Sequence, residues 1–294
     1  MRQLTHHGRY RYTSILNRPD YDFPGGKRLA VYLGFNIEHF DFGEGLGVAL
    51  GPVSPQPDVL NYSWRDYGNR VGVWRCLELF DQLGVPTGTI INTALYDYCP
   101  EVVAAFVMRG DEIIGHGHTN SERQGVMSEG DEQTLIVACR ERIRNVSGKA
   151  PRGWLSPWIS ESAVTSDLLA EAGYTYTLNW CHDDQPTQIT TRAGGSIMSI
   201  PYPQELNDVP MIVARQMDGR AFADMLIDNY AEMLRQSKSQ PLVMGIALHP
   251  YIVGQPYRLS HLRRALTHIV ESRQAWITTP GAICDHVTSP LQND

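Results

Sequence analysis

The chain has 294 residues and a formal net charge of -7, with 42% hydrophobic and 19% charged residues. This composition is typical of a folded globular protein and not of a disordered one. The acidic balance, without a Lys/Arg-rich run, argues against nucleic acid as a partner. No segment approaches the ~20 apolar residues of a membrane helix, and no apolar leader opens the chain, so a cytoplasmic location is expected.

The N-terminal third divides into three segments. Residues 1–26 are rich in Tyr, Arg and Pro, and we expect an irregular arm lying over a domain or a neighbouring subunit. Residues 29–37 are mostly apolar, which predicts a strand buried on both faces. The Gly- and Pro-rich segment from Asp41 to Tyr67 is expected to be a long loop, and such loops in compact domains are usually functional.

Strands and helices are expected to alternate through the rest of the chain. The predicted strands cover residues 87–92, 112–114, 153–155, 174–178, 197–200, 242–248 and 275–278. The predicted helices cover residues 73–83, 101–109, 131–146, a segment from Ser160 or Ser162 to Gly173, 220–237 and 259–272, with a short helix at the end. Because no GxGxxG or P-loop sequence follows a strand, this alternation favours an α/β barrel of parallel strands formed by residues 1–294 as one domain.

Polar clusters follow several of the predicted strands directly. They come after Ile37, Ile114, Leu155, Leu178 and Leu248. In α/β barrels the chemistry lies where strands end and helices begin, so this coincidence predicts an enzyme.

Glu38 stands at the end of the first buried strand. A carboxylate there is unfavourable unless it is paired, hydrogen-bonded or metal-bound, and a simple salt bridge to an arginine is the alternative reading. Asn36 and Glu38 have the i, i+2 spacing that places both side chains on one face of a strand. We expect both to point into the mouth of the barrel.

Two further clusters carry histidines. The segment His116-Gly117-His118-Thr119-Asn120 has spacings that bind metal, although a pair of hydrogen-bonded structural histidines is an equal alternative. His249 lies between the most apolar strand and Pro250, so its ring is expected to be held rigidly, as a general acid requires. A structural histidine is the alternative there.

The remaining clusters are less specific. Arg152 is predicted to hold a carboxylate or to bind a substrate oxygen, whereas Trp154 is equally consistent with core packing. Asp183 and Asp184 are common turn formers. No GxSxG elbow and no cysteine in a nucleophile setting is found, so direct attack of water on a carbonyl is expected.

The order of these motifs resembles the NodB-type polysaccharide deacetylase superfamily over nearly the whole chain. The likeness rests on Asn36-Ile37-Glu38, on the segment from Gly110 to His116, on Arg152-Gly153-Trp154 and on Leu248-His249. Three further segments are similar to the branch of cyclic imide hydrolases and allantoinase-like enzymes: Asp183-Asp184-Gln185-Pro186, Glu205-Leu206-Asn207-Asp208 and LHPYIVGQPYR from Leu248 to Arg258.

The resemblance implies a deformed (β/α) barrel with about seven parallel strands, usually packed as a homotetramer. It also implies hydrolysis of an amide carbon–nitrogen bond without a covalent intermediate. Two departures stand out: Asn36 occupies the position of the deacetylases' aspartate base, and Asn120 that of their second metal-binding histidine. A shift of the alignment by one residue would make Glu38 the base and His39 the ligand, and the sequence leaves both alignments open.

The leading hypothesis is therefore a hydrolase that opens a small cyclic amide or imide ring of the dicarboximide, hydantoin or allantoin type. Glu38, His116 and Asn120 would bind a divalent ion, with zinc expected first, or Glu38 and His116 would orient the water directly. Arg152 would anchor the site and His249 would protonate the leaving nitrogen. Substrate-binding positions are assigned to Asn36, Trp154, Trp180, Asp183 and Asp208. The alternatives are an N-deacetylase of amino-sugar oligosaccharides or polysaccharides and a catalytically inactive barrel that serves as a binding protein.

Overall fold

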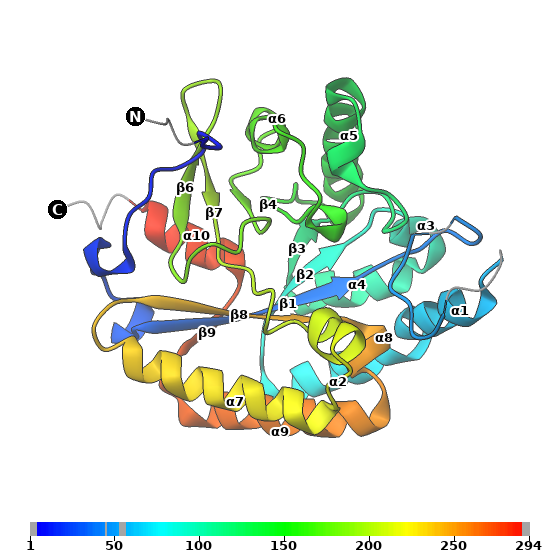
Figure 1. Ribbon diagram of the computed structural model, residues 1–294. Helices are drawn as coiled ribbons and strands as arrows, with labels where there is room; N and C mark the ends of the chain where they lie inside the picture. Colours follow the sequence, from blue (N-terminus) through cyan, green and yellow to red (C-terminus); the bar gives the residue numbers. More distant parts are fainter. Residues whose placement is uncertain (1–4, 45, 53–56, 290–294) are drawn as a thin grey trace.

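The computed structural model describes residues 5–44, 46–52 and 57–289. One mostly parallel sheet contains the strands of these residues, in the order β6-β7-β5-β4-β3-β2-β1-β8, with β9 paired to β1 (Figure 1). Only β6 runs antiparallel to its neighbour. The strands are β1 (Leu29–Ile37), β2 (Thr87–Ile91), β3 (Glu112–Gly115), β4 (Gly153–Trp154), β5 (Tyr176–Thr177), β6 (Thr187–Thr190), β7 (Ser196–Ser199), β8 (Leu242–Leu248) and β9 (Trp276–Thr278).

Helices follow most of the parallel strands and surround the sheet. In Figure 1, α7 and α9 run side by side beneath β8 and β9, and the two helices are in contact along their length. The α-helices are α1 (Val59–Tyr67), α2 (Val73–Leu83), α3 (Leu95–Tyr98), α4 (Pro100–Arg109), α5 (Glu129–Ser147), α6 (Thr165–Glu171), α7 (Gly219–Gln236), α8 (Pro250–Val253), α9 (Pro256–Ser272) and α10 (Pro280–Thr288).

The sheet curls into a partly closed barrel. Between the edge strands β6 and β8 no ladder forms among the described residues, and irregular backbone bridges the seam instead. Val243 N donates to Asp184 O at 2.8 Å, and Ala247 N donates to Leu206 O at 2.9 Å. The expected α/β fold with a deformed parallel barrel is thus confirmed.

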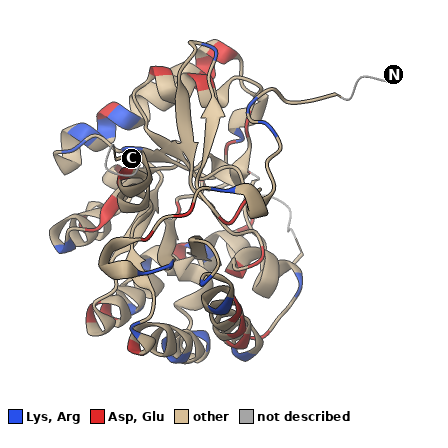
Figure 2. Ribbon diagram, turned by 90° about the vertical axis from the view of Figure 1, so that its left-hand side faces the viewer, with Lys and Arg blue, Asp and Glu red and all other residues tan. Residues whose placement is uncertain are grey.

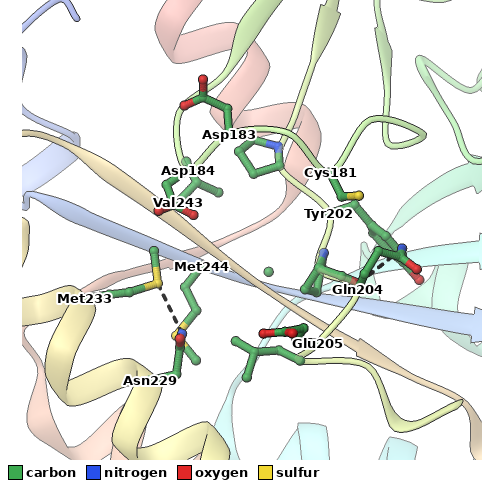
Figure 3. A pocket seen from close by; sticks show the side chains of 14 residues that line it. Cys181, Asp183, Asp184, Tyr202, Gln204, Glu205, Asn229, Met233, Val243 and Met244 are labelled. Carbon is green, nitrogen blue, oxygen red and sulfur yellow. Dashed lines mark hydrogen bonds between the residues drawn. The ribbon is translucent and has the colours of Figure 1, made fainter. Parts of the chain in front are cut away.

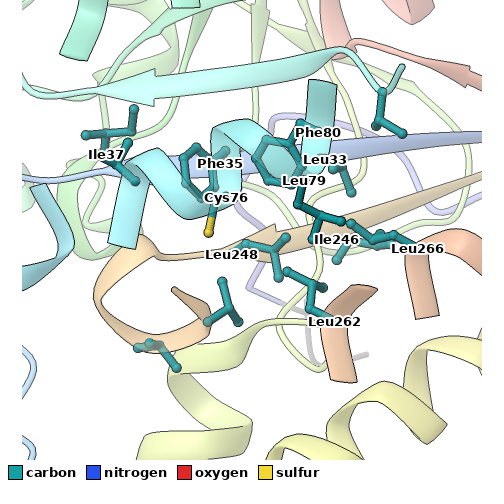
Figure 4. Close-up of a cluster of buried hydrophobic side chains, with 14 of the residues drawn as sticks. Leu33, Phe35, Ile37, Cys76, Leu79, Phe80, Ile246, Leu248, Leu262 and Leu266 are labelled. Carbon is teal, nitrogen blue, oxygen red and sulfur yellow. The ribbon is translucent and has the colours of Figure 1, made fainter. Parts of the chain in front are cut away.

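The central strand β1 separates two cores because its side chains alternate between the faces of the sheet. Leu33, Phe35 and Ile37 pack outward against α2, α9 and β8 in the apolar cluster of Figure 4. On the other face, Tyr32 reaches across the barrel and its hydroxyl donates to Pro201 O at 2.6 Å. Asn36 lies on this inner face too, so the strand directs the next inward residue, Glu38, to the barrel mouth.

The expectation of a long loop from Asp41 to Tyr67 is wrong in its second half. Residues 59–67 form α1, whose N-terminus is capped by the Asp58 carboxylate accepting from Asn61 N. A π-helical turn, Gly68–Gly72, then joins α1 to α2. The two glycines are explained by close packing, since a Cβ at Gly68 or Gly72 would stand 2.7 Å or 2.1 Å from the α8 backbone.

The N-terminal segment 5–26 carries two short 3-10 turns, Ile15–Asn17 and Pro24–Gly26. It lies along the β6–β7 side of the sheet, where Arg9 pairs with Asp167 at 2.6 Å and Tyr10 stacks on His182. Figure 2 shows Lys, Arg, Asp and Glu mixed over the helices around the sheet. None of the described helices combines the length and apolarity that a membrane-spanning segment needs.

Candidate active site

Glu38 is the centre of a buried polar cluster at the carboxyl end of β1. Its Oε1 lies 3.5 Å from His116 Nε2 and 3.5 Å from His249 Nε2. Its Oε2 accepts a hydrogen bond of 3.0 Å from the Tyr251 hydroxyl. All four side chains are buried. The cluster therefore combines one carboxylate with two imidazoles and a phenol away from bulk water.

The register of the parallel strands brings these residues together. Phe35 of β1 pairs with Leu248 of β8, and Ile91 of β2 pairs with Gly115 of β3. The residues that follow, including Glu38, His116 and His249, consequently leave the sheet at the same edge. This is the edge at which α/β barrels carry their active sites.

His249 is fixed by both oxygens of Asp208. Its Nδ1 bonds to Asp208 Oδ1 at 2.6 Å, and its backbone N–H donates to Oδ2 at 2.7 Å. Burial by itself lowers the pKa of His249, but the adjacent carboxylates of Asp208 and Glu38 outweigh it and raise the pKa to about 10. His249 is therefore protonated at neutral pH, with Nε2–H directed at Glu38.

The pKa of Glu38 is shifted in the opposite direction from that of His249. Burial opposes its ionisation, yet His249 and His116 together lower its pKa to about 2. Burial raises the pKa of Asp208 although His249 pulls it down. The resting cluster thus contains an ionised Glu38 and a protonated His249, an arrangement that separates base and acid at one site.

His116 presents a free ring nitrogen to Glu38. Its Nδ1 is bonded to the carbonyl of Leu155 at 2.6 Å, and because a carbonyl only accepts, Nδ1 carries the proton. Its buried Nε2 has no hydrogen-bond partner among the described residues. That nitrogen is therefore available to a water molecule or to a divalent ion beside Glu38.

Two asparagines hold the loops that carry these groups. Asn92 Nδ2 donates to His116 O and, at 3.5 Å, to Asn120 Oδ1, while Asn92 Oδ1 accepts from His39 N at 2.9 Å. Asn69 Nδ2 donates to Glu38 O at 2.8 Å. Asn120 accordingly lies beside His116, as predicted. The His39 ring instead faces Asp41 and Tyr98, so Glu38 is the residue that joins the histidines.

Arg152 does not join this cluster, which corrects the prediction that it anchors the site. It precedes β4 and therefore lies at the amino end of that strand, where its half-exposed guanidinium pairs with Asp285 of α10. Trp154 is also placed differently from the prediction. It is fully buried in the core, and its Nε1 donates to Gln124 and Ser156.

Two other predicted substrate-binding residues lie at the seam of the barrel. Trp180 is half-buried against His7 and Tyr10 of the N-terminal segment. Asp183 pairs with Arg18 and lines a pocket of about 330 Å³ together with Glu205 and Met244 (Figure 3). This pocket does not include Glu38, so the structure assigns these residues to a region apart from the cluster.

The last two predicted positions lie within or beneath the cluster. Asp208 is present, but it contacts His249 and so positions the acid. Asn36 Nδ2 donates to the Tyr202 hydroxyl at 2.9 Å and to Leu248 O at 3.3 Å, which ties β1 to β8 under Glu38. Tyr251, Asn69 and Asn92 were not predicted. Of these three, only Tyr251 could have been found from the sequence, because it belongs to the segment from Leu248 to Arg258 that resembles the cyclic imide hydrolases.

Comparison with known proteins shows which family the chain is similar to. The family model described as "Polysaccharide deacetylase" matches residues 60–177. The peptidoglycan deacetylase of Helicobacter pylori is 28% identical over 192 residues, which is 64% of each chain and thus slightly less than two thirds of that relative.

Two solved structures are similar over almost their whole length. A crystal structure from Pseudomonas aeruginosa PAO1, described as a probable polysaccharide deacetylase, has a TM-score of 0.83 and 25% identity, covering 93% of this chain and 96% of that chain. The allantoinase PuuE has a TM-score of 0.83 and 25% identity, covering 96% of this chain and 99% of that chain.

Residues 60–177 are thus similar to the polysaccharide deacetylase family, and the whole fold is similar to that of a probable polysaccharide deacetylase. This family generally uses a divalent metal, and a catalytic zinc typically takes three protein ligands. The described residues form no metal-binding group of three His, Cys, Asp or Glu side chains. Glu38 and His116 offer two donors, but the third predicted ligand, Asn120, has a weakly ligating amide oxygen that already faces Asn92. These donors do not fit a tight three-ligand zinc site.

Proposed function

We propose that this protein is a hydrolase that opens a small cyclic amide or imide by direct addition of water to a ring carbonyl. The observation that carries the proposal is the buried triad of Asp208, His249 and Glu38, in which a protonated imidazole lies between two carboxylates. Such a triad supplies a base for water and an acid for the departing nitrogen at the same carbonyl.

The reaction follows from these positions. Ionised Glu38 takes a proton from a water that also hydrogen-bonds to His116 Nε2, and the water oxygen bonds to the carbonyl carbon. His249 Nε2–H then protonates the ring nitrogen as the carbon–nitrogen bond breaks. The products are a carboxylic acid and an amide or amine in one opened chain. Return of the proton from Glu38 to His249 over their 3.5 Å separation restores the resting state.

The cover over the cluster favours a small substrate. Glu38, His116 and His249 have only 6%, 2% and 5% of their surface exposed. The segment after β1 is fastened across the site, because Asp41 N donates to Ser121 Oγ at 2.9 Å and Leu50 N donates to Asn61 Oδ1 at 2.8 Å. A polysaccharide needs an open groove at the reacting group, whereas a small ring needs an enclosed pocket. The likeness to PuuE, an allantoinase, supports the same substrate class.

The second candidate is N-deacetylation of an amino-sugar oligosaccharide or polysaccharide. It is supported by the similarity to the peptidoglycan deacetylase of Helicobacter pylori. Both reactions break an amide bond by attack of water, so the cluster chemistry by itself does not separate them. The buried position of the cluster is the observation that favours the ring.

A substrate panel tests the proposal. Ring opening of succinimide, glutarimide, hydantoin and allantoin is compared with acetate release from chitin oligomers and peptidoglycan fragments. We expect turnover of at least one ring at a rate well above any acetate release, and loss of that turnover in His116→Ala. The exposed neighbour His118 provides the control, and His118→Ala should remain active. Faster acetate release than ring opening would establish the deacetylase instead.

The metal and the assembly are tested separately. Since the described donors do not fit a tight zinc site, we expect dialysis against a chelator to change ring-opening activity by less than about twofold. Substoichiometric metal by elemental analysis should accompany that result, and loss of activity that zinc restores would overturn it. The homotetramer implied by the family resemblance is tested by light scattering on the eluting protein.

A further inference from the structure

Arg65 on α1 is a buried cation that forms no ion pair with a carboxylate of the described residues. Only 8% of its surface is exposed, yet no ion pair joins it to an Asp or Glu among the described residues. One guanidinium nitrogen, Nη1, donates to Val48 O at 3.0 Å. Its Nε is buried and has no hydrogen-bond partner in the described part of the chain.

Burial of the Arg65 guanidinium lowers the stability of the folded protein. Burying a charge costs several kcal/mol unless a counter-charge and hydrogen bonds compensate for the lost hydration. The contact of the guanidinium with the Phe40 ring, at 4.4 Å from its centroid, compensates only in part. Arg65 therefore retains donors that a ligand oxygen can use.

The residue belongs to the same wall as the catalytic carboxylate. One small cavity of about 10 Å³, roughly the room of a single water molecule, is lined by Glu38, His39, Phe40, Tyr62, Arg65, Asp66 and Asn69. Asp66 is engaged elsewhere, since it accepts from the Tyr98 hydroxyl at 2.6 Å and lies 4.0 Å from Arg70. The wall is rigid because Phe40, on which Arg65 lies, and Trp64 both contact the Tyr251 ring. Tyr251 in turn holds Glu38 Oε2. A cavity of this size admits one oxygen atom and not a ring.

We propose that Arg65 is a specificity-determining residue that binds a second carbonyl oxygen of the ring, distinct from the carbonyl that water attacks. This inference rests on the proposed function and narrows its substrate class to rings with two carbonyls, such as imides and hydantoins. The second oxygen occupies the cavity, and the guanidinium fork donates to it. A lactam with one carbonyl leaves these donors unsatisfied and binds weakly.

The test compares Arg65→Met and Arg65→Lys with the unmodified protein on succinimide as substrate and 2-pyrrolidinone as competitive inhibitor. We expect Arg65→Met to raise KM for succinimide by roughly 10- to 100-fold, the loss typical of a charged hydrogen bond, with kcat within a few-fold. The inhibition constant of 2-pyrrolidinone should stay unchanged. Arg65→Lys keeps the positive charge, so its KM for succinimide should lie between those of the unmodified protein and Arg65→Met.

The matched control is Arg70→Met. Arg70 lies one turn further along, and its side chain is 71% exposed, so KM should not change. Thermal unfolding and circular dichroism of each variant check the fold. A merely structural role of Arg65 would lower kcat and stability together and weaken lactam and imide alike, and that result would overturn the proposal.

A binding measurement separates failure of this inference from failure of the proposed function. Calorimetric titration with succinamate, the ring-opened product of succinimide, needs no turnover. Ring opening with an unchanged KM and unchanged succinamate affinity in Arg65→Met would refute the role of Arg65 alone. If no ring is opened by any form of the protein, Arg65-dependent succinamate binding would still support Arg65 as an oxygen-binding residue, and its absence would reject both.

Discussion

The two ends of the barrel each contain a hydrogen-bonded glutamate, buried Glu38 and half-buried Glu112, and the two residues have opposite surroundings. At the amino ends of the strands, Glu112 accepts from the Tyr176 hydroxyl at 2.7 Å and from Gly281 N at 2.8 Å. Loss of hydration raises the pKa of Glu112, and the hydrogen bonds from Tyr176 and Gly281 offset this only in part. At the carboxyl ends, two imidazoles face Glu38 and lower its pKa to about 2. The neutral hydrogen-bond donors around Glu112 suit a structural role. At the other end, Glu38 is ionised and His249 is protonated, so the pair can accept and donate a proton during catalysis.

The largest expected effect comes from removing the acid. His249→Ala should lower kcat for ring opening by roughly 10²–10⁴-fold, the contribution typical of general acid catalysis, because the variant lacks the imidazolium that protonates the leaving nitrogen. Steady-state kinetics measures the loss, and circular dichroism verifies that the variant is folded. Activity close to that of the unmodified protein would contradict the assigned role.

Matched substitutions of the two glutamates test the comparison directly. Glu38→Gln removes the base and should lower kcat by roughly 10²-fold or more. Glu112→Gln should leave kcat within about twofold but cost about 1–3 kcal/mol of unfolding free energy, since the amide leaves one buried donor without an acceptor. Kinetics and denaturant unfolding measure both quantities. Equal losses of activity in the two variants would contradict the assignment of a catalytic role to Glu38 and a structural role to Glu112.

The pH dependence tests the role of Asp208. Activity needs His249 protonated, so kcat/KM should fall as pH rises toward the His249 pKa of about 10. Asp208→Asn removes a carboxylate that raises this pKa, so the alkaline limb should move to lower pH. The folded-state pKa of His249 lies above its usual 6.5, so its stabilising contribution is complete below pH 6.5 and is lost as pH rises toward 10. Asp208→Asn should therefore also reduce the alkaline loss of stability. If the alkaline limb of the kcat/KM profile does not move in Asp208→Asn, a group other than His249 controls that limb.

The smallest effect is expected for Arg152→Ala. The Arg152–Asp285 pair is 43% and 59% exposed at its side chains, and exposed pairs contribute about 0–1 kcal/mol. Ring-opening kinetics should be unchanged because the pair lies at the amino end of the sheet. A large drop in kcat with intact stability would restore the role that the sequence suggested for Arg152.

The sequence determined which strand ends carry the chemistry. A run of apolar residues followed at once by Glu38, His116 or His249 is a local pattern, and the i, i+2 rule placed Asn36 on the inner face of β1 without knowledge of the fold. Arg152 was misplaced although its strand was found correctly. It precedes Gly153, so it leaves β4 at the opposite end from the residues that follow Leu155.

Tertiary structure decided how the cluster is completed. Asp208, at the start of the π-helical turn Val209–Ala214, bonds to His249, and Tyr251 of the short helix α8 bonds to Glu38. Arg65 of α1 lines the same small cavity as Glu38, and no periodic pattern in the sequence marked these segments. Gly68 and Gly72, which directly follow α1, are required by close packing against α8. The reactive residues at the strand ends can be recognised from their immediate neighbours in the sequence. The residues that set their protonation states and cover them come from distant segments, and only the packing of the folded chain brings these segments together.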